Sequence, residues 1–239
     1  MDLLINNIQN IKLDDSNKWL VEDALDSYLK YINNLNKLDQ SALKYFLMNV
    51  KMRELKNNQE TEQEPSFLIG LYILSQKQNS IDLTVNLLKK GFLTRDDIEL
   101  IHGCVIAGST DDKIENYPFR TDNNKWVGSF LANGERVIDY MPPDYNDIES
   151  LLEIILDYVN EKTNDPNDIF IKSFVIHGLI GYLQPFGNGN TRLARVVQHG
   201  EIMAKTNEIL KTEFIKPILY LSENYLKTRP QYRNLVKQL

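Results

Sequence analysis

The sequence predicts a mainly α-helical protein that carries one β-hairpin. Over most of the 239 residues, apolar residues recur at the period of an amphipathic helix, with short polar or glycine-bearing turns between the segments. The alternation typical of strands is confined to one stretch, 125–138. A chain of this length can bury one substantial core. We therefore expect one compact unit, with an N-terminal helical region at 1–90 packed on a core at 91–239.

The N-terminal region is expected to form three successive amphipathic helices. Their apolar periodicity places them near residues 16–35, 39–57 and 65–78. No apolar stretch in the sequence approaches the length of a membrane span.

Two further helices are expected before the most informative segment of the chain. The first, at 94–107, begins with a capping threonine, Thr94, and has an acid three residues later, as in a capping box. The second, at 146–160, places its apolar residues on one stripe, so it should pack against the same core. That stripe consists of Ile148, Leu151, Leu152, Ile155 and Val159.

The hairpin is expected at 125–138, where two short apolar or β-branched runs flank Asn133-Gly134. Asn-Gly supplies the positive backbone dihedrals that a tight hairpin turn needs. Pro142-Pro143 should close the hairpin off before the next helix.

Composition, net charge and the single cysteine limit the classes of protein to which this sequence can belong. Hydrophobic residues make up 42% and charged residues 25%, which is typical of a soluble globular protein. The net charge of −6 disfavours a nucleic-acid partner. Cys104 is the single cysteine, which rules out an internal disulfide and suits a reducing compartment; a buried, inert thiol is the expected state. The N-terminus lacks the features of a secretion signal, so we expect a cytoplasmic protein, with export as an effector left open.

The segment with the clearest chemical signature is residues 177–200, in which an apolar helix leads through a glycine and asparagine loop into another helix. Gly187 and Gly189 let the backbone turn sharply, and the next helix should begin near Asn190 with its unpaired N–H groups and positive dipole end. Arg192 and Arg195 lie three residues apart and should project from one face. This arrangement is typical of a phosphate site, although such a loop can also be purely structural.

Here the sequence resembles the Fic (Fic/DOC) family. The family's loop has the form H-P-F-x-(D/E)-G-N-G-R-x-x-R, and residues 184–195 read Q-P-F-G-N-G-N-T-R-L-A-R. The matching positions are Pro185, Phe186, Gly189, Asn190, Arg192 and Arg195.

The resemblance extends over roughly residues 54–239. The helix that ends at His102-Gly103 looks like the one before the family's flap, and Arg120 and Trp126-Val127-Gly128 resemble the flap pattern. His177 lies where family members commonly place a histidine on the helix before the loop, and the stretch from Pro217 resembles the closing helix. The resemblance implies a Fic-type helical bundle with the hairpin as its flap and 184–195 as its motif loop.

The activity that the resemblance implies is transfer of AMP, or a related phosphate-containing group, from a nucleotide such as ATP to a protein hydroxyl, with Mg²⁺ on the phosphates. The phosphate-binding positions would be Gly187, Gly189, Asn190, Thr191, Arg192 and Arg195. Asn190 would also be a catalytic residue, and the protein target would dock at the flap by strand addition.

Departures from the motif put that activity in question. The family's general base, a histidine, is Gln184 here, and an amide cannot take a proton. The metal-binding acid is Asn188, a weaker ligand for Mg²⁺, and the second motif glycine is Thr191, which could crowd the phosphates or cap the next helix. Two hypotheses therefore stay open: a transferase with partial or altered chemistry, and a pseudoenzyme that binds a nucleotide or a partner protein without turnover.

Other candidate residues have a functional and a structural interpretation. His177 and His199 could substitute for the base, but both are expected to be packing or surface histidines. Residues 54–63 loosely resemble the family's inhibitory helix, with Glu62 at the position of its glutamate. A polar helix end or loop is the alternative for that stretch.

Three aromatic residues near the flap could stack on a nucleotide base, although packing is their more common role. These residues are Trp126, Tyr140 and Tyr145.

Overall fold

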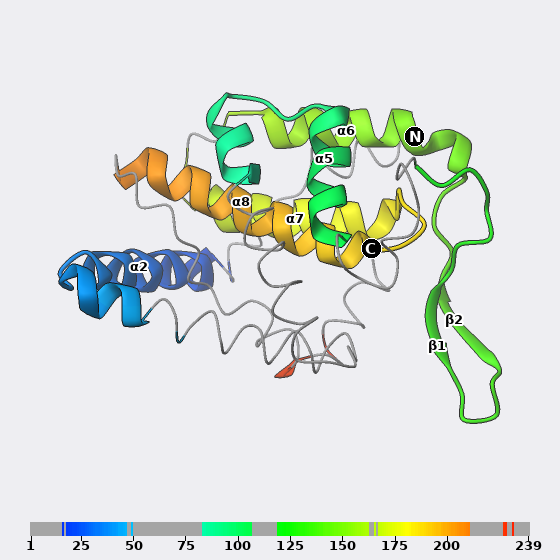
Figure 1. Ribbon diagram of the computed structural model, residues 1–239, viewed down its shortest axis with the longest axis horizontal. Coiled ribbons are helices and arrows are strands. Elements are labelled where there is room, and N and C mark those ends of the chain that lie inside the picture. Colours follow the sequence, from blue (N-terminus) through cyan, green and yellow to red (C-terminus); the bar gives the residue numbers. More distant parts are fainter. Residues whose placement is uncertain are drawn as a thin grey trace.

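The computed structural model describes residues 16, 18–46, 49, 83–106, 119–162, 165, 167–210, 227–228 and 231. Its elements are α2 (Lys18–Leu35), α5 (Arg95–Ile106), β1 (Val127–Phe130), β2 (Arg136–Tyr140), the 3₁₀ turn η2 (Tyr145–Asp147), α6 (Ile148–Asn160), α7 (Asp168–Leu183) and α8 (Asn190–Leu210). Figure 1 labels all of them except η2. Residues 40–46 and 83–89 are also helical.

The predicted helices at 16–35 and 94–107 are confirmed as α2 and α5. The helix predicted at 146–160 is confirmed as α6, preceded by η2, and its apolar stripe is buried. Of the helix predicted at 39–57, residues 40–46 are helical. The helix predicted at 65–78, the segment 54–63 with Glu62, and most of the segment after Pro217 lie outside the described residues.

The centre of the fold is the pair α7 and α8, with α6 packed on α7 and α5 packed on α8 (Figure 1). Apolar residues surround α7 rather than forming one stripe, as expected of a helix covered by neighbours on several sides. The main core contains completely buried side chains from all four helices, among them Ile101, Ile148, Ile176 and Leu193. A smaller apolar cluster joins α2 to α7 and α8.

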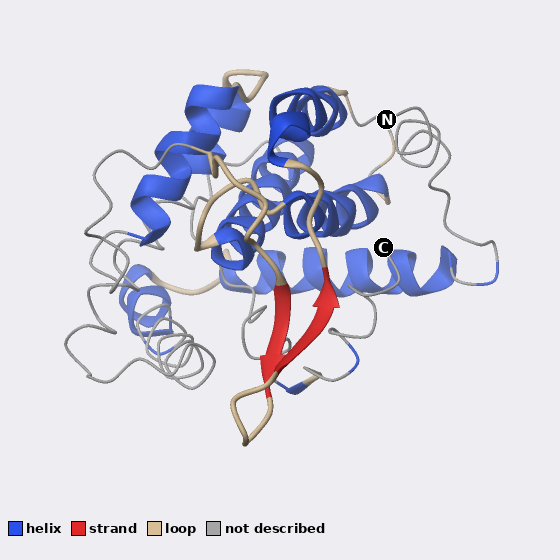
Figure 2. Ribbon diagram, turned by 90° about the vertical axis from the view of Figure 1, so that its right-hand side faces the viewer, coloured by secondary structure: helices blue, strands red, loops and turns tan. Residues whose placement is uncertain are grey.

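The predicted hairpin is confirmed and projects from the helical body at the end opposite α2 (Figures 1 and 2). The strands β1 and β2 are antiparallel, with Phe130 opposite Arg136. The prediction that Asn133 shares a positive φ with Gly134 is wrong: Gly134 has a φ of 85°, and Gln184 is the one described non-glycine residue with a positive φ. Gly134 is thus the last residue of a loop between Leu131 and Glu135, and a loop that ends in a left-handed glycine is a common alternative to the tighter two-residue turn.

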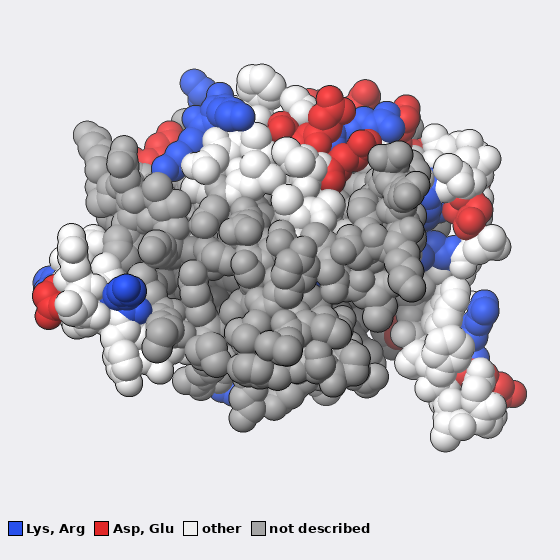
Figure 3. Space-filling view, in the orientation of Figure 1, with Lys and Arg blue, Asp and Glu red and all other residues white. Residues whose placement is uncertain are grey.

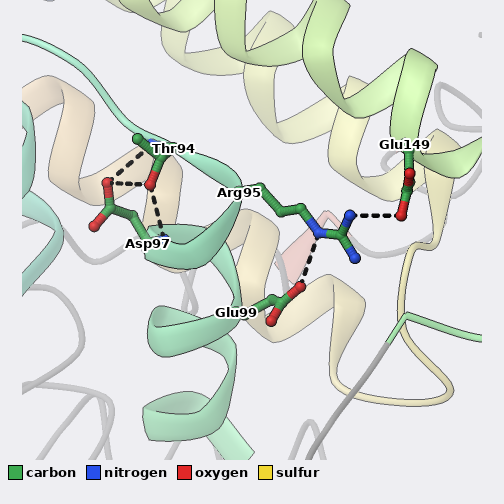
Figure 4. A network of polar contacts seen from close by, with 5 residues as sticks. All are labelled: Thr94, Arg95, Asp97, Glu99 and Glu149. Atoms are coloured by element: carbon green, nitrogen blue, oxygen red, sulfur yellow. Dashed lines mark hydrogen bonds and ion pairs between the residues drawn. The ribbon is translucent and has the colours of Figure 1, made fainter.

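Thr94 and Arg95, at the start of α5, make several polar contacts (Figure 4). The hydroxyl of Thr94 lies 2.9 Å from the Asp97 carboxylate, which also accepts from the backbone N–H of Thr94. Arg95 donates to Glu99 on its own helix and to Glu149 on α6. The contact between Arg95 and Glu149 joins the first turn of α5 to α6.

No helix within the described ranges is both long and apolar enough to cross a membrane.

Candidate functional site

Of the predicted motif at 184–195, residues 184–189 connect the end of α7 to the start of α8, and these six residues are called the motif loop below. Gln184 ends α7 in the left-handed conformation, with φ 45° and ψ 57°. Its side-chain amide donates to the carbonyl of Gly181 at 2.7 Å, and the residue is buried. The side chain at the position of the family's base is therefore directed back at the last turn of α7.

Backbone carbonyls of the motif loop are held by the segment that leads into the flap. Arg120 donates from its backbone N–H to the carbonyl of Pro185 and from Nε to that of Gln184, both at 2.9 Å. Lys125, just before β1, donates from Nζ to the carbonyl of Gly187 at 2.7 Å. Residues 120–125, which precede β1, are called the flap root below. The buried guanidinium of Arg120 and the half-buried ammonium of Lys125 thus connect this side of the loop to the flap root.

The opposite side of the loop is held by α5 and α8. Nε2 of His102 lies 2.8 Å from the carbonyl oxygen of Asn188. The buried amide of Asn190 closes on the backbone of Phe186: its Oδ1 accepts from the N–H at 2.9 Å, and its Nδ2 donates to the carbonyl at 2.7 Å. Every carbonyl from residue 184 to residue 188 therefore has a polar partner in the surrounding scaffold.

Holding the carbonyls in this way favours an anion site at the start of α8. The first N–H groups of a helix have no partner within the helix, and they carry the positive end of its dipole. Arg192 on the first turn is partly exposed, whereas Arg195 one turn later is buried. The accessible side of the loop and helix start is formed by Gly187, Asn188, Thr191 and Arg192.

Gly189 is required by both its conformation and its surroundings. Its φ is 79°, and a Cβ added there would lie 2.5 Å from Cγ2 of Ile106 and 3.0 Å from Nε2 of His102. By contrast, a Cβ on Gly187 would meet no atom within 4 Å. Gly189 therefore lets the loop approach α5 closely, which is where His102 reaches Asn188.

The residues of this loop do not fit a magnesium ion held by protein carboxylates. Asn188 offers a neutral amide, and its Oδ1 accepts from the N–H of Gly189 at 2.7 Å. Among the residues that the structure describes, no group of three or more His, Cys, Asp or Glu side chains is placed to hold a metal. Mg²⁺ prefers charged oxygen ligands in octahedral geometry, so this donor set is a poor match for it.

The two histidines considered as substitute bases are both buried in the helix packing. Nδ1 of His177 on α7 lies 2.8 Å from Oε1 of Gln198 on α8. Burial, opposed by that hydrogen bond, lowers the pKa of His177 to about 4. His199 is also buried on α8. Neither residue contributes to the exposed side of the loop.

Two of the three aromatic residues near the flap, Trp126 and Tyr140, have packing partners. The hydroxyl of Tyr140 donates to the carbonyl of Tyr182 at 2.5 Å, and burial raises the pKa of Tyr140. The ring of Trp126 meets Phe130 edge-on, and the guanidinium of Arg136 lies 5.3 Å from the centre of that ring. Tyr145, on η2, is exposed.

Sequence reasoning assigned no site role to three residues that hold the loop. His102 and Arg120 contributed to the family resemblance, but the contacts they make were not foreseen, and Lys125 was missed. Lys125 and Gly187 are 62 residues apart in the chain, so no periodic pattern connects them. The weak signal for His102 was a polar residue on the apolar side of α5, where it is buried with Ile98, Ile101 and Val105.

Comparison with known proteins identifies this region. The model of the Fic/DOC family matches residues 92–200. Residues 92–200 are thus similar to the Fic/DOC domain. The matched residues include α5, the flap, α6, α7 and the first half of α8, and thus the whole motif loop. No protein with a curated description matches the chain.

Solved structures agree with the Fic fold. A Fic family protein from Desulfovibrio desulfuricans superposes with a TM-score of 0.62 at 14% identity, over 95% of this chain and 67% of its own. A Fic-domain-containing signalling protein from Bacteroides thetaiotaomicron gives 0.52 at 13% identity, over 93% and 96%. Fic-1 from C. elegans gives 0.54 at 15% identity, over 92% and 73%. The predicted mainly helical Fic-type fold with one hairpin is confirmed.

Proposed function

We propose that the motif loop and the first turn of α8 bind the phosphate groups of a nucleotide such as ATP, and that transfer of AMP from this site to a protein hydroxyl is slow. The proposal rests on the observation that every backbone carbonyl from residue 184 to residue 188 has a hydrogen-bond partner outside the loop. With the carbonyl dipoles engaged there, the helix start and Arg192 give the site a positive potential.

The slow transfer follows from the residue at the position of the base. A hydroxyl nucleophile needs a group that accepts its proton, and an amide has no useful basicity. The amide of Gln184 is moreover engaged with the carbonyl of Gly181. Loss of a general base lowers a rate by about 10²- to 10⁴-fold, so we expect residual activity at most.

A second candidate function is nucleotide or partner binding without turnover, that is, a Fic-fold pseudoenzyme. The specific observation in its favour is that Gln184 and Asn188, the positions of the base and of the metal-binding acid, both direct side-chain atoms at the backbone of their own neighbours. Under this hypothesis phosphate binding persists while chemistry is absent.

The flap is the proposed docking site for a protein target. Within the described residues the sheet consists of the two hairpin strands, so each strand has one edge at which an extended segment could pair. On the face seen in Figure 3 most of the hairpin is uncharged, with charged side chains along its outer edge. Its exposed large apolar side chains are Phe130, Leu131, Val137 and Ile138. Such residues favour an extended target segment with apolar side chains.

Calorimetric titration with ATP and ADP tests the phosphate site. We expect Arg192→Ala to weaken binding by about tenfold, because it removes a charge-assisted bond to phosphate. Lys162→Ala, an exposed charge change after α6, is the matched control. Unchanged affinity in Arg192→Ala and Arg195→Ala together would overturn the proposed function.

Incubation with isotope-labelled nucleotides, followed by mass spectrometry of the protein and a model hydroxyl substrate, separates the two candidates. A slow adduct supports the transferase. Binding without any adduct supports the pseudoenzyme.

A further inference from the structure

One face of the flap carries an arginine among aromatic and aliphatic side chains. Phe130 on β1 lies directly opposite Arg136 on β2, and directly opposite residues project from the same face of a sheet. The centre of the Trp126 ring lies 5.2 Å from that of Phe130 and 5.3 Å from the guanidinium of Arg136. Side chains alternate along a strand, so Ile138 lies on the same face as Arg136. These four residues, Trp126, Phe130, Arg136 and Ile138, are called the flap platform below.

The flap platform is continuous and accessible. Gly128 lies between Trp126 and Phe130 in the chain, and a Cβ added there would collide with the carbonyl oxygen of the opposite strand at Val137. Because Gly128 has no side chain, none separates the two rings, and they meet edge-on. Phe130 is 63% exposed and Ile138 is 52% exposed. The platform therefore offers apolar surface to a ligand at the outside of the flap.

The charge on this face is positive. Within β1 and β2 the charged residues are Arg136 and Asp139, and alternation places Asp139 on the opposite face. The carboxylate of Glu135, just before β2, accepts from the side-chain amide of Asn133. In the part of the chain that the structure describes, ion pairs join other residues, and Arg136 lies over the Trp126 ring. A guanidinium over an aromatic ring can still donate two N–H bonds to one carboxylate.

Building on the proposed docking of a target at the flap, we propose that the flap binds an extended protein segment in which an acidic and an apolar residue lie two positions apart, and that Arg136 determines this preference. A segment paired with either strand presents every second side chain to the flap platform. Its carboxylate would contact Arg136, and its apolar side chain would cover Phe130 or Ile138. Strand pairing requires a peptide backbone, and the net charge of −6 opposes a polyanion far more than a single carboxylate.

Fluorescence anisotropy of labelled synthetic peptides, titrated with the full chain, tests the proposal. The peptides are rich in valine and threonine, which favour an extended chain, and carry glutamate and phenylalanine two positions apart, in both orders. In matched peptides lysine replaces the glutamate. We expect the wild-type protein to bind the better glutamate peptide about fivefold more tightly than its lysine counterpart, because Arg136 attracts one and repels the other.

Substitutions at Arg136 show whether this side chain sets the preference. Arg136→Glu should make the lysine peptide the tighter ligand, and Arg136→Gln, which removes the charge and keeps a polar side chain, should reduce the preference for glutamate. Lys162→Glu, the same change in net charge at an exposed position after α6, should leave the preference unchanged. Equal wild-type affinities for the two peptides, no binding of either glutamate peptide, or an unaltered preference in the two Arg136 variants would overturn the proposal.

A labelled single-stranded oligonucleotide tests the other class of macromolecule that aromatic rings and an arginine can bind. If it binds more tightly than the glutamate peptides, and Arg136→Gln weakens it, the proposal is overturned in favour of a nucleic acid. The contacts of Arg136 lie within the flap, so Arg136→Glu should leave ATP affinity unchanged. Failure of the peptides alone would thus leave the proposed phosphate site standing, whereas loss of ATP binding alone would overturn that site and leave the peptide preference.

Discussion

The imidazole ring of His102 lies face to face with the ring of Phe186, with centroids 3.7 Å apart and planes 4° from parallel. Because a carbonyl only accepts hydrogen bonds, the contact between Nε2 and the oxygen of Asn188 requires the proton on Nε2. One side chain from α5 therefore fixes the motif loop both by stacking and by a hydrogen bond.

We expect His102→Ala to destabilise the fold by about 2–3 kcal/mol and to weaken ATP binding, because it removes both contacts from the loop. Thermal unfolding and ATP titration measure the two effects. Gly103→Ala, at the next position of α5, is a suitable control, since a Cβ there meets no atom within 4 Å. An unchanged ATP affinity in a folded His102→Ala variant would show that the loop keeps its shape without the histidine.

Gly189→Ala should be more damaging than Gly187→Ala, the other glycine substitution in the loop. The new methyl group would collide with Ile106 and His102, and alanine disfavours the observed φ of 79°. We expect a loss of about 2 kcal/mol or more in the free energy of unfolding, measured by urea denaturation. Gly187→Ala places its methyl group in open space two residues earlier, so its stability should stay near that of the wild type. Equal stabilities of the two variants would contradict the close approach of the loop to α5.

Gln184→His should raise AMP transfer to the protein itself or to a model hydroxyl by at least about tenfold, because histidine titrates near neutrality and can accept the proton. Mass spectrometry of the adduct measures the rate. The surrounding bonds from Arg120 to the carbonyls of residues 184 and 185 do not involve this side chain, so the loop should persist. If the variant binds ATP and remains inert, the binding-only function becomes the better description.

Glu201 is a buried carboxyl whose two oxygens have no hydrogen-bond partner within the described part of the chain. Burial raises its pKa, while the positive charges of Lys172 and Lys205 oppose that shift and the negative charge of Glu208 adds to it. The folded state thus holds its proton more tightly than the unfolded state does, and stability falls as pH rises above the ordinary carboxyl range.

Glu201→Gln should accordingly stabilise the protein at neutral pH by about 1–2 kcal/mol and have little effect near pH 4, since glutamine is neutral at both. Urea unfolding at the two pH values measures the difference. Glu153→Gln, the same substitution at an exposed position of α6, is the control. A destabilised Glu201→Gln variant at neutral pH would mean that the charged form is favoured in the folded state.

The parts of the fold that were predictable from the sequence are those governed by local rules. The apolar stripe of α6 and the capping pattern of Thr94 and Asp97 gave elements close to those observed. The start of α8 at Asn190 followed from the glycine-bearing loop before it. Position 133 was misjudged because the Asn-Gly pair is compatible with more than one hairpin turn, and strand register decides between them.

The contacts that shape the candidate site were not predictable, because each joins residues far apart in the chain. Arg120 lies 64 residues before the carbonyl it holds at Gln184, and His102 lies 86 residues before Asn188. The residue types at 184 and 188 indicated altered chemistry, but the direction of each side chain depends on the neighbouring backbone. Local periodicity carries no information about such pairs.

Hydrogen bonds from Arg120 and Lys125 connect the flap root to the motif loop, so a displacement of one segment acts on the other. A target segment that shifted the flap root would strain the same carbonyls that shape the phosphate site. Any free energy by which one ligand changes the binding of the other must then be equal in both directions. Binding of the proposed target at the flap would thus be linked thermodynamically to binding of the proposed nucleotide at the loop through two cationic side chains, without contact between the two ligands.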